Sequence, residues 1–391
     1  TDVDSSNRCC SSHLAGVLAV FGDELSLEHR CHWHDRSGPH RGASLRPTGE
    51  RVVPSGLIRG LRVKTMRFGT TLLHDHLDGG LRPGTLLDLA SECGYDGLPA
   101  QTADGLADWF VTSASGTLTD YLATFHHTGA VMQTAPALQR VAFEAAEDCS
   151  EVGVRLAEFR FAPTQHLADG LALDEVIAAV LSGLDEARAA TGVNSGLILC
   201  AARPMDDSLV VAEAAARWAD DGVVGFDLCA AEIGFPHDMH REALDLCQDR
   251  GVPITIHAGE DLGPESIDLA LRCGASRIGH GIAVVDDCEW DENGSLVDTG
   301  PVANKVLDEQ IPLEVCITSN LQTKRWAPDA HPFGQMYRSG FNVTLNTDNR
   351  LQSATDLVAE YQLAADAFDL SAHDLVRIDR HAAAATFVRS A

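Results

Sequence analysis

Eight short apolar runs, each followed by a longer segment with helical periodicity, constrain the fold of this chain more than any other feature. Near-continuous apolar runs are typical of parallel strands that are covered on both faces. Eight strand–helix units in series predict an α/β fold, a (β/α)8 or TIM barrel. The runs are Thr71–Leu77, Val154–Phe161, Gly196–Ala202, Val223–Leu228, Pro253–His257, Arg277–His280, Leu313–Ile317 and Asn342–Leu345.

The segment between the first two runs, residues 79–153, is long enough for several helices and predicts a helical insertion after the first strand. Within it, Leu118, Tyr121, Leu122 and Phe125 fall at i, i+3, i+4 and i+7 and form an apolar stripe. One interpretation is ordinary core packing. The other is a lid over a bound ligand, because barrel active sites lie where the strands end.

The composition excludes several classes of partner. The 391 residues carry a formal net charge of −28, which argues against nucleic acid and anionic membranes as partners. No apolar run is long enough to predict a membrane span. The 11 cysteines include no Cys-x-x-Cys pair, and Cys200, Cys229 and Cys316 lie in strand-like runs. Reduced, buried thiols favour a cytoplasmic enzyme. No feature of the sequence indicates an oligomeric state.

Residues 1–60 differ in character from the rest, because Cys and His cluster there beside a stretch rich in Gly, Pro, Arg and Ser. We predict that this segment is disordered or is a non-native N-terminal extension. Metal binding by its Cys and His residues is the less favoured interpretation. Residues 61–391 are predicted to form the metal-dependent barrel.

Ionisable residues recur where the predicted strands end. His74 and His76 close the first run, and residues two apart on a strand face the same side. His257, His280 and Asp348 stand at the ends of the fifth, sixth and eighth runs. A barrel brings these ends into one ring, so the sequence predicts that the five side chains meet in one site.

Three neutral imidazoles and one carboxylate suit a zinc ion that keeps an open position for water. Zinc lowers the pKa of bound water from about 15.7 to about 7. Glu260 follows His257 by three residues and is predicted to lie near the metal as an acid, while His280 is placed to hydrogen-bond the hydroxide. The predicted ligands of a single zinc ion are His74, His76, His257 and Asp348.

Five strings in order resemble the adenosine deaminase family of the amidohydrolase superfamily, and are most similar to its bacterial branch. They are His-x-His-Leu-Asp-Gly from His74, His-Ala-Gly-Glu from His257, Arg-x-Gly-His-Gly from Arg277, Thr-Ser-Asn from Thr318 and Asn-Thr-Asp from Asn346. The resemblance covers about residues 65–385. It implies zinc-dependent hydrolysis of adenosine or 2′-deoxyadenosine to inosine or deoxyinosine and ammonia.

The resemblance also implies roles for individual residues. Glu260 resembles the proton donor to purine N1, His280 the group that orients the hydroxide, and Asp348 completes the catalytic set. Asp78 looks like the contact to the ribose 5′-hydroxyl. The residues implied to face the substrate are His76, Asp78, Ala230, Asn349, Leu118, Leu122 and Phe125.

Two of these positions depart from the family pattern. Asn349 stands where many members carry an Asp that contacts purine N7, and the Asn amide donates a hydrogen bond without needing protonation. Ala230 stands where Gly is usual, beside purine N3, so the backbone N–H is retained but a methyl group is added near the base.

Two alternatives remain open at this point. One is deamination of another 6-aminopurine, such as adenine or a modified adenine nucleoside; Asp78 favours a nucleoside because adenine-specific relatives tend to carry Glu there. The other is a non-catalytic barrel that binds a metal or ligand. The presence of both Glu260 and His280 argues against it.

Overall fold

The computed structural model describes residues 68–388, so the predicted extension over residues 1–60 lies outside the described residues. Eight parallel strands form one sheet in the order β1-β2-β3-β4-β5-β6-β9-β10. The end of the last strand closes onto the first, because Asp348 N–H donates to the His74 carbonyl (3.0 Å) and His76 N–H to the Asp348 carbonyl (2.8 Å). The predicted (β/α)8 barrel is confirmed. The strands are β1 Thr71–His76, β2 Leu156–Phe161, β3 Asn194–Ala202, β4 Val223–Cys229, β5 Ile254–Ala258, β6 Arg277–His280, β9 Leu313–Val315 and β10 Val343–Leu345.

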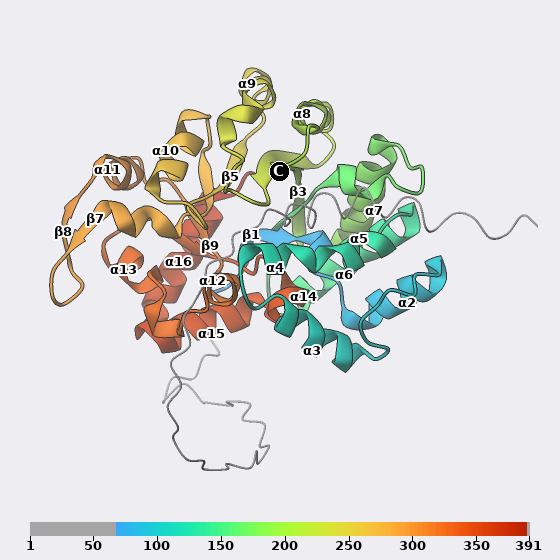
Figure 1. Ribbon diagram of the computed structural model, residues 1–391, viewed down its shortest axis with the longest axis horizontal. Helices are drawn as coiled ribbons and strands as arrows, with labels where there is room; N and C mark the ends of the chain where they lie inside the picture. Colours follow the sequence, from blue (N-terminus) through green and yellow to red (C-terminus); the bar gives the residue numbers. More distant parts are fainter. Residues whose placement is uncertain (1–67, 389–391) are drawn as a thin grey trace, which may run out of the picture.

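The helical insertion after β1 is also present, and its helices, coloured blue to teal, lie together in Figure 1. The predicted apolar stripe is divided between two short helices rather than one, because α4 ends at Ala123 and α5 begins at Phe125. Thr117 and Asp120 form a reciprocal capping box that fixes the start of α4. The helices of the insertion are α2 Pro83–Cys93, α3 Ala103–Ser113, α4 Leu118–Ala123, α5 Phe125–Val131 and α6 Ala135–Glu151.

The remaining helices surround the strands, as Figure 1 shows. Most of them lie between consecutive strands, and the last three follow β10. They are α7 Leu173–Thr191, α8 Ser208–Arg217, α9 Arg241–Arg250, α10 Pro264–Arg272, α11 Pro301–Asp308, α12 Ile317–Lys324, α13 Phe333–Arg338, α14 Arg350–Ser353, α15 Leu357–Phe368 and α16 Ala372–Ala385. Within the described part of the chain, none of these helices combines the length and apolarity that crossing a membrane requires.

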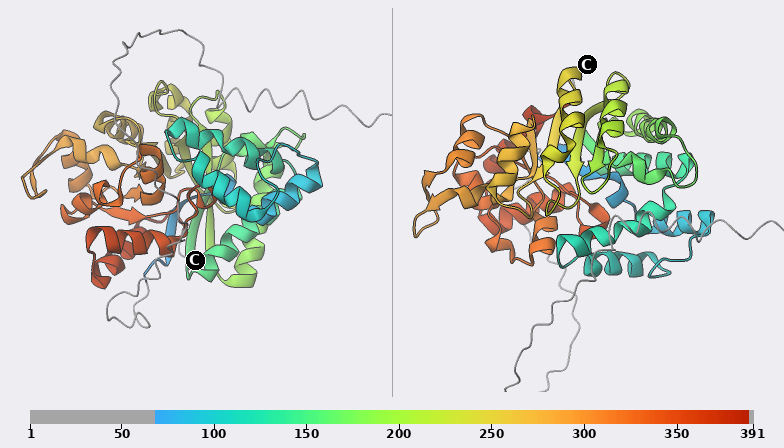
Figure 2. Two further views of the ribbon diagram at one scale, coloured as in Figure 1. Left: turned by 60° about the horizontal axis from the view of Figure 1, so that its bottom comes forward. Right: turned by 45° about the horizontal axis from the view of Figure 1, so that its top comes forward.

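Two features differ from the sequence prediction. The seventh run does not continue as a strand to Ile317, since β9 stops at Val315 and α12 begins at Ile317. The buried Glu360 carboxylate accepts the N–H of Thr318 (3.2 Å) and so stabilises an early helix start. In addition, β7 Cys288–Trp290 and β8 Leu296–Thr299 form an unpredicted hairpin that projects from the barrel in both views of Figure 2.

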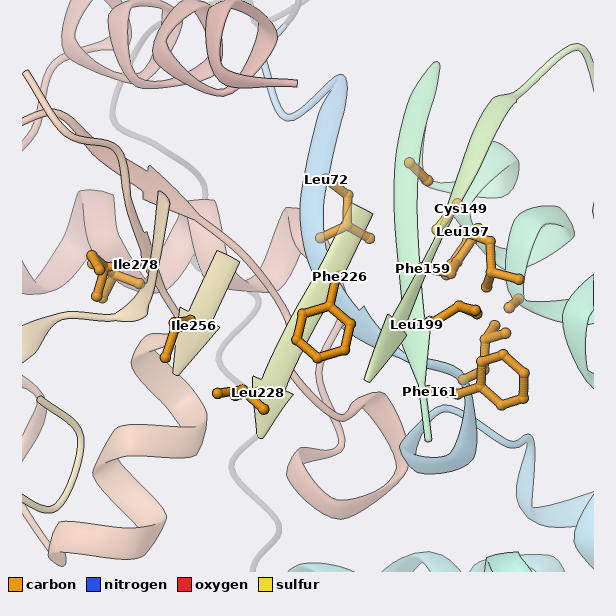
Figure 3. Close-up of a cluster of buried hydrophobic side chains, with 14 of the residues drawn as sticks. Leu72, Cys149, Phe159, Phe161, Leu197, Leu199, Phe226, Leu228, Ile256 and Ile278 are labelled. Carbon is orange, nitrogen blue, oxygen red and sulfur yellow. The ribbon is translucent and has the colours of Figure 1, made fainter. Parts of the chain in front are cut away.

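The two faces of the strands carry different chemistry. Residues such as Phe159, Phe226 and Ile278 contribute to a buried apolar cluster, part of which Figure 3 shows. On β2, the intervening Arg160 is fully buried and bonds Asp227 of β4, through Nη1 and Oδ2 at 2.9 Å. The runs are therefore covered on both faces, as predicted, but one of the faces is partly ionic.

Candidate active site

The histidines that end β1 and β5 meet the carboxylate that follows β10. His76 Nε2 lies 3.3 Å from His257 Nε2 and 3.5 Å from Asp348 Oδ1, and His74 Nε2 lies 3.2 Å from the same oxygen. Asp348 holds a left-handed backbone conformation (φ 58°) that turns the chain sharply after β10. These side chains are buried, and their nitrogen and oxygen atoms lie close together.

The outer nitrogens of two of these histidines bond buried carboxylates. His74 Nδ1 lies 3.0 Å from Glu314 Oε2, and His257 Nδ1 lies 3.1 Å from Asp227 Oδ1. An ionised carboxylate can only accept, so each ring in its neutral form carries its proton on Nδ1 and presents a bare Nε2 to the site. His74 Nε2 is buried without a hydrogen-bond partner among the described residues. A buried, unpaired acceptor beside two others and a carboxylate fits a bound metal cation.

His280 belongs to the same cluster, since one ligand atom from each of His74, His257, His280 and Asp348 lies within 4.8 Å of the others. Distance alone therefore does not separate His280 from His76 as a ligand. His280 differs in its outer contact, because Nδ1 faces the Asn320 amide nitrogen at 3.1 Å and not a carboxylate. Its own backbone is left-handed (φ 60°) at the end of β6.

Glu260 stands over the cluster on the loop after β5. Its Oε2 lies 3.5 Å from His280 Nε2, and the side chain is buried. Burial, with the nearby Asp348 and Glu232 charges, raises the pKa of Glu260 well above its usual value. The acid form of this carboxyl group is therefore favoured, which is the form that can donate a proton.

The loop that carries Glu260 is held by a residue that sequence reasoning missed. The Glu232 carboxylate accepts the backbone N–H groups of Gly259 (2.8 Å), Glu260 (3.1 Å), Asp261 (2.6 Å) and Leu262 (2.9 Å). Four N–H donors on one buried carboxylate fix the loop conformation. Nothing in the sequence around Glu232 signals this, because the loop folds back on it from a different unit of the barrel.

A cavity opens beside the cluster, and the apolar stripe of the insertion lies along it. Ala230 is left-handed (φ 69°), a conformation that costs a residue with a Cβ roughly 1–2 kcal/mol, which explains why Gly suits this position. A Cβ on Gly79 would overlap the Asn349 side chain, so the Asp-Gly turn leaves room for that amide. The predicted residues that line the cavity are His76, Asp78, Leu118, Leu122, Phe125, Ala230, His257, Glu260, His280, Asp348 and Asn349, while His74 lies buried beside them.

One edge of the cavity holds two unpaired acceptors. His166 donates from Nδ1 to the Met132 carbonyl (2.9 Å), which leaves its Nε2 as an acceptor 4.0 Å from Asp78 Oδ2. Within residues 68–388, His166 Nε2 and Asp78 Oδ1 have no hydrogen-bond partner. Burial raises the pKa of Asp78 to about 7 and lowers that of His166 to about 4. A ligand hydroxyl at this edge would satisfy an otherwise unpaired buried group.

Comparison with known proteins identifies the family of this chain. The family model described as adenosine deaminase matches residues 70–391. An adenosine deaminase of Mycobacterium avium is 47% identical over 328 residues, covering 81% of this chain and 90% of the relative. Adenosine deaminase 1 of Streptomyces coelicolor is also 47% identical, over 332 residues, 82% of this chain and 83% of the relative.

Solved structures share the fold at lower identity. An adenine deaminase from Arthrobacter aurescens has a TM-score of 0.73 at 24% identity, and covers 83% of this chain and 95% of that one. An Arabidopsis N6-mAMP deaminase has a TM-score of 0.70 at 26% identity, with 82% and 94% covered. Similarly folded proteins thus bear the names of deaminases of different purines, and the substrate depends on the lining of the cavity.

Proposed function

Because this chain belongs to the adenosine deaminase family and is a deaminase of adenosine, we propose that it works with one zinc ion and also accepts 2′-deoxyadenosine. The observation that carries this proposal is the convergence of bare imidazole nitrogens and a carboxylate beneath a buried acid. The proposed ligands are His74, His76, His257 and Asp348. When bound there, zinc supplies a water nucleophile at neutral pH.

Glu260 and His280 are proposed to act on either side of the reacting carbon C6, at N1 and at the attacking oxygen. Attack at C6 of adenine leaves negative charge on the ring, and Glu260 is proposed to neutralise it by donating its proton to N1. His280 is proposed to hold the attacking oxygen in line with C6. Asn349 donates to N7 from its amide and Ala230 to N3 from its backbone N–H, so the base is held along its edge before the proton moves.

A nucleoside, rather than a nucleotide, suits the far edge of the cavity. Asp78 and His166 offer acceptors there, and none of the described residues that line the cavity is an Arg or a Lys. A 5′-hydroxyl can donate to Asp78, whereas a 5′-phosphate would face a carboxylate without any cation to offset it. Leu118, Leu122 and Phe125 are proposed to cover the ribose with an apolar surface.

The test combines metal analysis with a substrate panel. The purified protein is expected to hold one zinc per chain and to convert adenosine and 2′-deoxyadenosine much faster than adenine or AMP. A His257→Ala variant should lose both metal and turnover. Zinc-loaded protein that turns over none of the panel would contradict the proposal. A preference for adenine would contradict it as well and would favour adenine as the substrate.

Asp78→Ala tests the contact to the 5′-hydroxyl. At about pH 8, above the Asp78 pKa of about 7, the wild type is expected to prefer adenosine over 5′-deoxyadenosine by about 10- to 100-fold in kcat/KM, the range for one hydrogen bond to a charged group. In the variant this preference should fall towards one, while kcat/KM for 5′-deoxyadenosine changes little. An unchanged preference would mean that Asp78 does not bind the hydroxyl.

Asp227→Asn tests the carboxylate behind His257. Asn can still bond His257 Nδ1, but its acceptor carries no charge and its orientation can reverse. Loss of such an outer partner typically weakens metal affinity by 10–100-fold, and we expect about that decrease in a competition titration against a chelator. Asp174→Asn is the matched control, because Asp174 pairs with Arg217 at an exposed position on the surface. Equal affinities of the two variants would contradict the prediction.

A further inference from the structure

We propose that Asn320 and His331 are positioning residues that fix His280 as the tautomer carrying its proton on Nε2. The two residues connect His280 to the start of α13 by three contacts. Phe333 N–H donates to His331 Nδ1 (3.1 Å), His331 Nε2 lies 3.3 Å from Asn320 Oδ1, and Asn320 Nδ2 lies 3.1 Å from His280 Nδ1. The inference rests on the proposed role of His280 at the reacting oxygen.

The direction of this chain of hydrogen bonds is set at its far end. The Phe333 backbone N–H can only donate, so His331 Nδ1 must accept. Burial lowers the pKa of His331 to about 3, so the ring is neutral and its single proton lies on Nε2. That N–H needs an acceptor, which is the Asn320 oxygen. The Asn320 amide group therefore faces His280, and the reversed amide would oppose two donors to each other.

The chain determines what His280 can do. Its Nδ1 accepts from Asn320, so the proton of the neutral ring is on Nε2, which points towards Glu260 and the ligand cluster. An N–H at that position donates to an oxygen; it does not ligate a metal or remove a proton. His74 and His257 show the opposite arrangement, because carboxylates hold their protons on Nδ1. The hydrogen-bond partner on Nδ1 thus determines that His74 and His257 can be metal ligands, whereas the similarly placed His280 is a hydrogen-bond donor.

The chain of hydrogen bonds from Phe333 through His331 and Asn320 to His280, called the relay below, is protected from water. Asn320 is fully buried, His331 is 3% exposed and His280 is 1% exposed. Solvent therefore cannot replace a lost partner. Asn320 lies in the first turn of α12, which begins at Ile317. A strand that continued through Ile317 would place the Asn320 amide elsewhere.

The tautomer can be observed directly on the zinc-loaded protein with nitrogen-15-labelled histidine, because protonated and bare ring nitrogens have well-separated chemical shifts. Signals of His280 are identified by their loss in His280→Gln. We expect a protonated Nε2 and a bare Nδ1 in the wild type. A protonated Nδ1 would overturn the proposal.

Asn320→Asp is the decisive variant. The carboxylate keeps the shape but accepts from both sides, so His280 should move its proton to Nδ1. With the donor lost, kcat should fall by about 10²–10³-fold with little change in KM. Unchanged His280 shifts in this variant would overturn the relay. A reversed tautomer with unchanged kcat would leave the relay standing and contradict the role of His280 in the proposed function.

His331 supplies a second test that does not add a charge. His331→Phe removes the donor to Asn320, and kcat is expected to fall by about tenfold, as for one weakened hydrogen bond. His331→Gln keeps an N–H donor and should restore most of the rate. His381→Phe is the control, because that half-buried ring bonds the Val343 carbonyl at the start of β10. A similar rate in His331→Phe and His381→Phe would overturn the proposal.

Discussion

Replacing Glu260 by glutamine is expected to lower kcat by about 10²–10⁴-fold, the range for loss of a positioned proton donor. The amide has the shape of the acid and can still bond purine N1, but it has no proton to transfer. Metal content should be unchanged, because Glu260 is not among the proposed ligands. Stability should change little, since the Glu260 carboxyl makes no hydrogen bond or ion pair with residues 68–388 closer than its 3.5 Å approach to His280.

Glu260→Asp gives the matched comparison. It keeps the acid but withdraws it by one methylene, so the rate should fall between those of the wild type and Glu260→Gln. Steady-state kinetics on adenosine, with zinc content and thermal midpoint measured for each variant, separate chemistry from folding. A Glu260→Gln enzyme that keeps more than a tenth of the wild-type kcat would remove Glu260 from the proton-donor role.

The strand-end residues could be predicted because their information is local. His74 and His76 share a strand face by spacing alone, and His257, His280 and Asp348 end runs whose barrel arrangement follows from the number of units. Once eight strand–helix units are recognised, closure of the barrel can be predicted without any further sequence feature. The structure accordingly gathers the five side chains at the end of the sheet where they were expected.

The residues that lie behind these five side chains could not be predicted in the same way. Asp227 and Glu314 are single charges inside apolar strands, and their use depends on which strand face turns inward. Asn320 was visible in a motif, but its role depends on a helix start that an apolar run through Ile317 concealed. His331 comes from a loop whose position only the folded chain defines.

Arg160 connects the outer partners of both histidines and is expected to be the most sensitive structural residue. Its Nη1 bonds Asp227 Oδ2 (2.9 Å), and its Nη2 bonds Glu314 Oε2 (2.8 Å) and the Leu73 carbonyl (2.7 Å). All of these groups are fully buried. Without the guanidinium, two carboxylates would keep their charge in the interior with fewer partners. Removing one member of a buried ion pair typically costs 3–5 kcal/mol.

Arg160→Met therefore should lower the free energy of unfolding by about 3–5 kcal/mol, measured in urea on chelator-treated protein so that metal binding does not contribute. The surface residue Arg82, which pairs with Glu147 and Asp148, provides the control. Arg82→Met should cost no more than about 1 kcal/mol. The metal affinity of Arg160→Met should fall as well, because Asp227 and Glu314 lose the charge that holds them ionised behind His257 and His74. Comparable stabilities of the two variants would contradict the prediction.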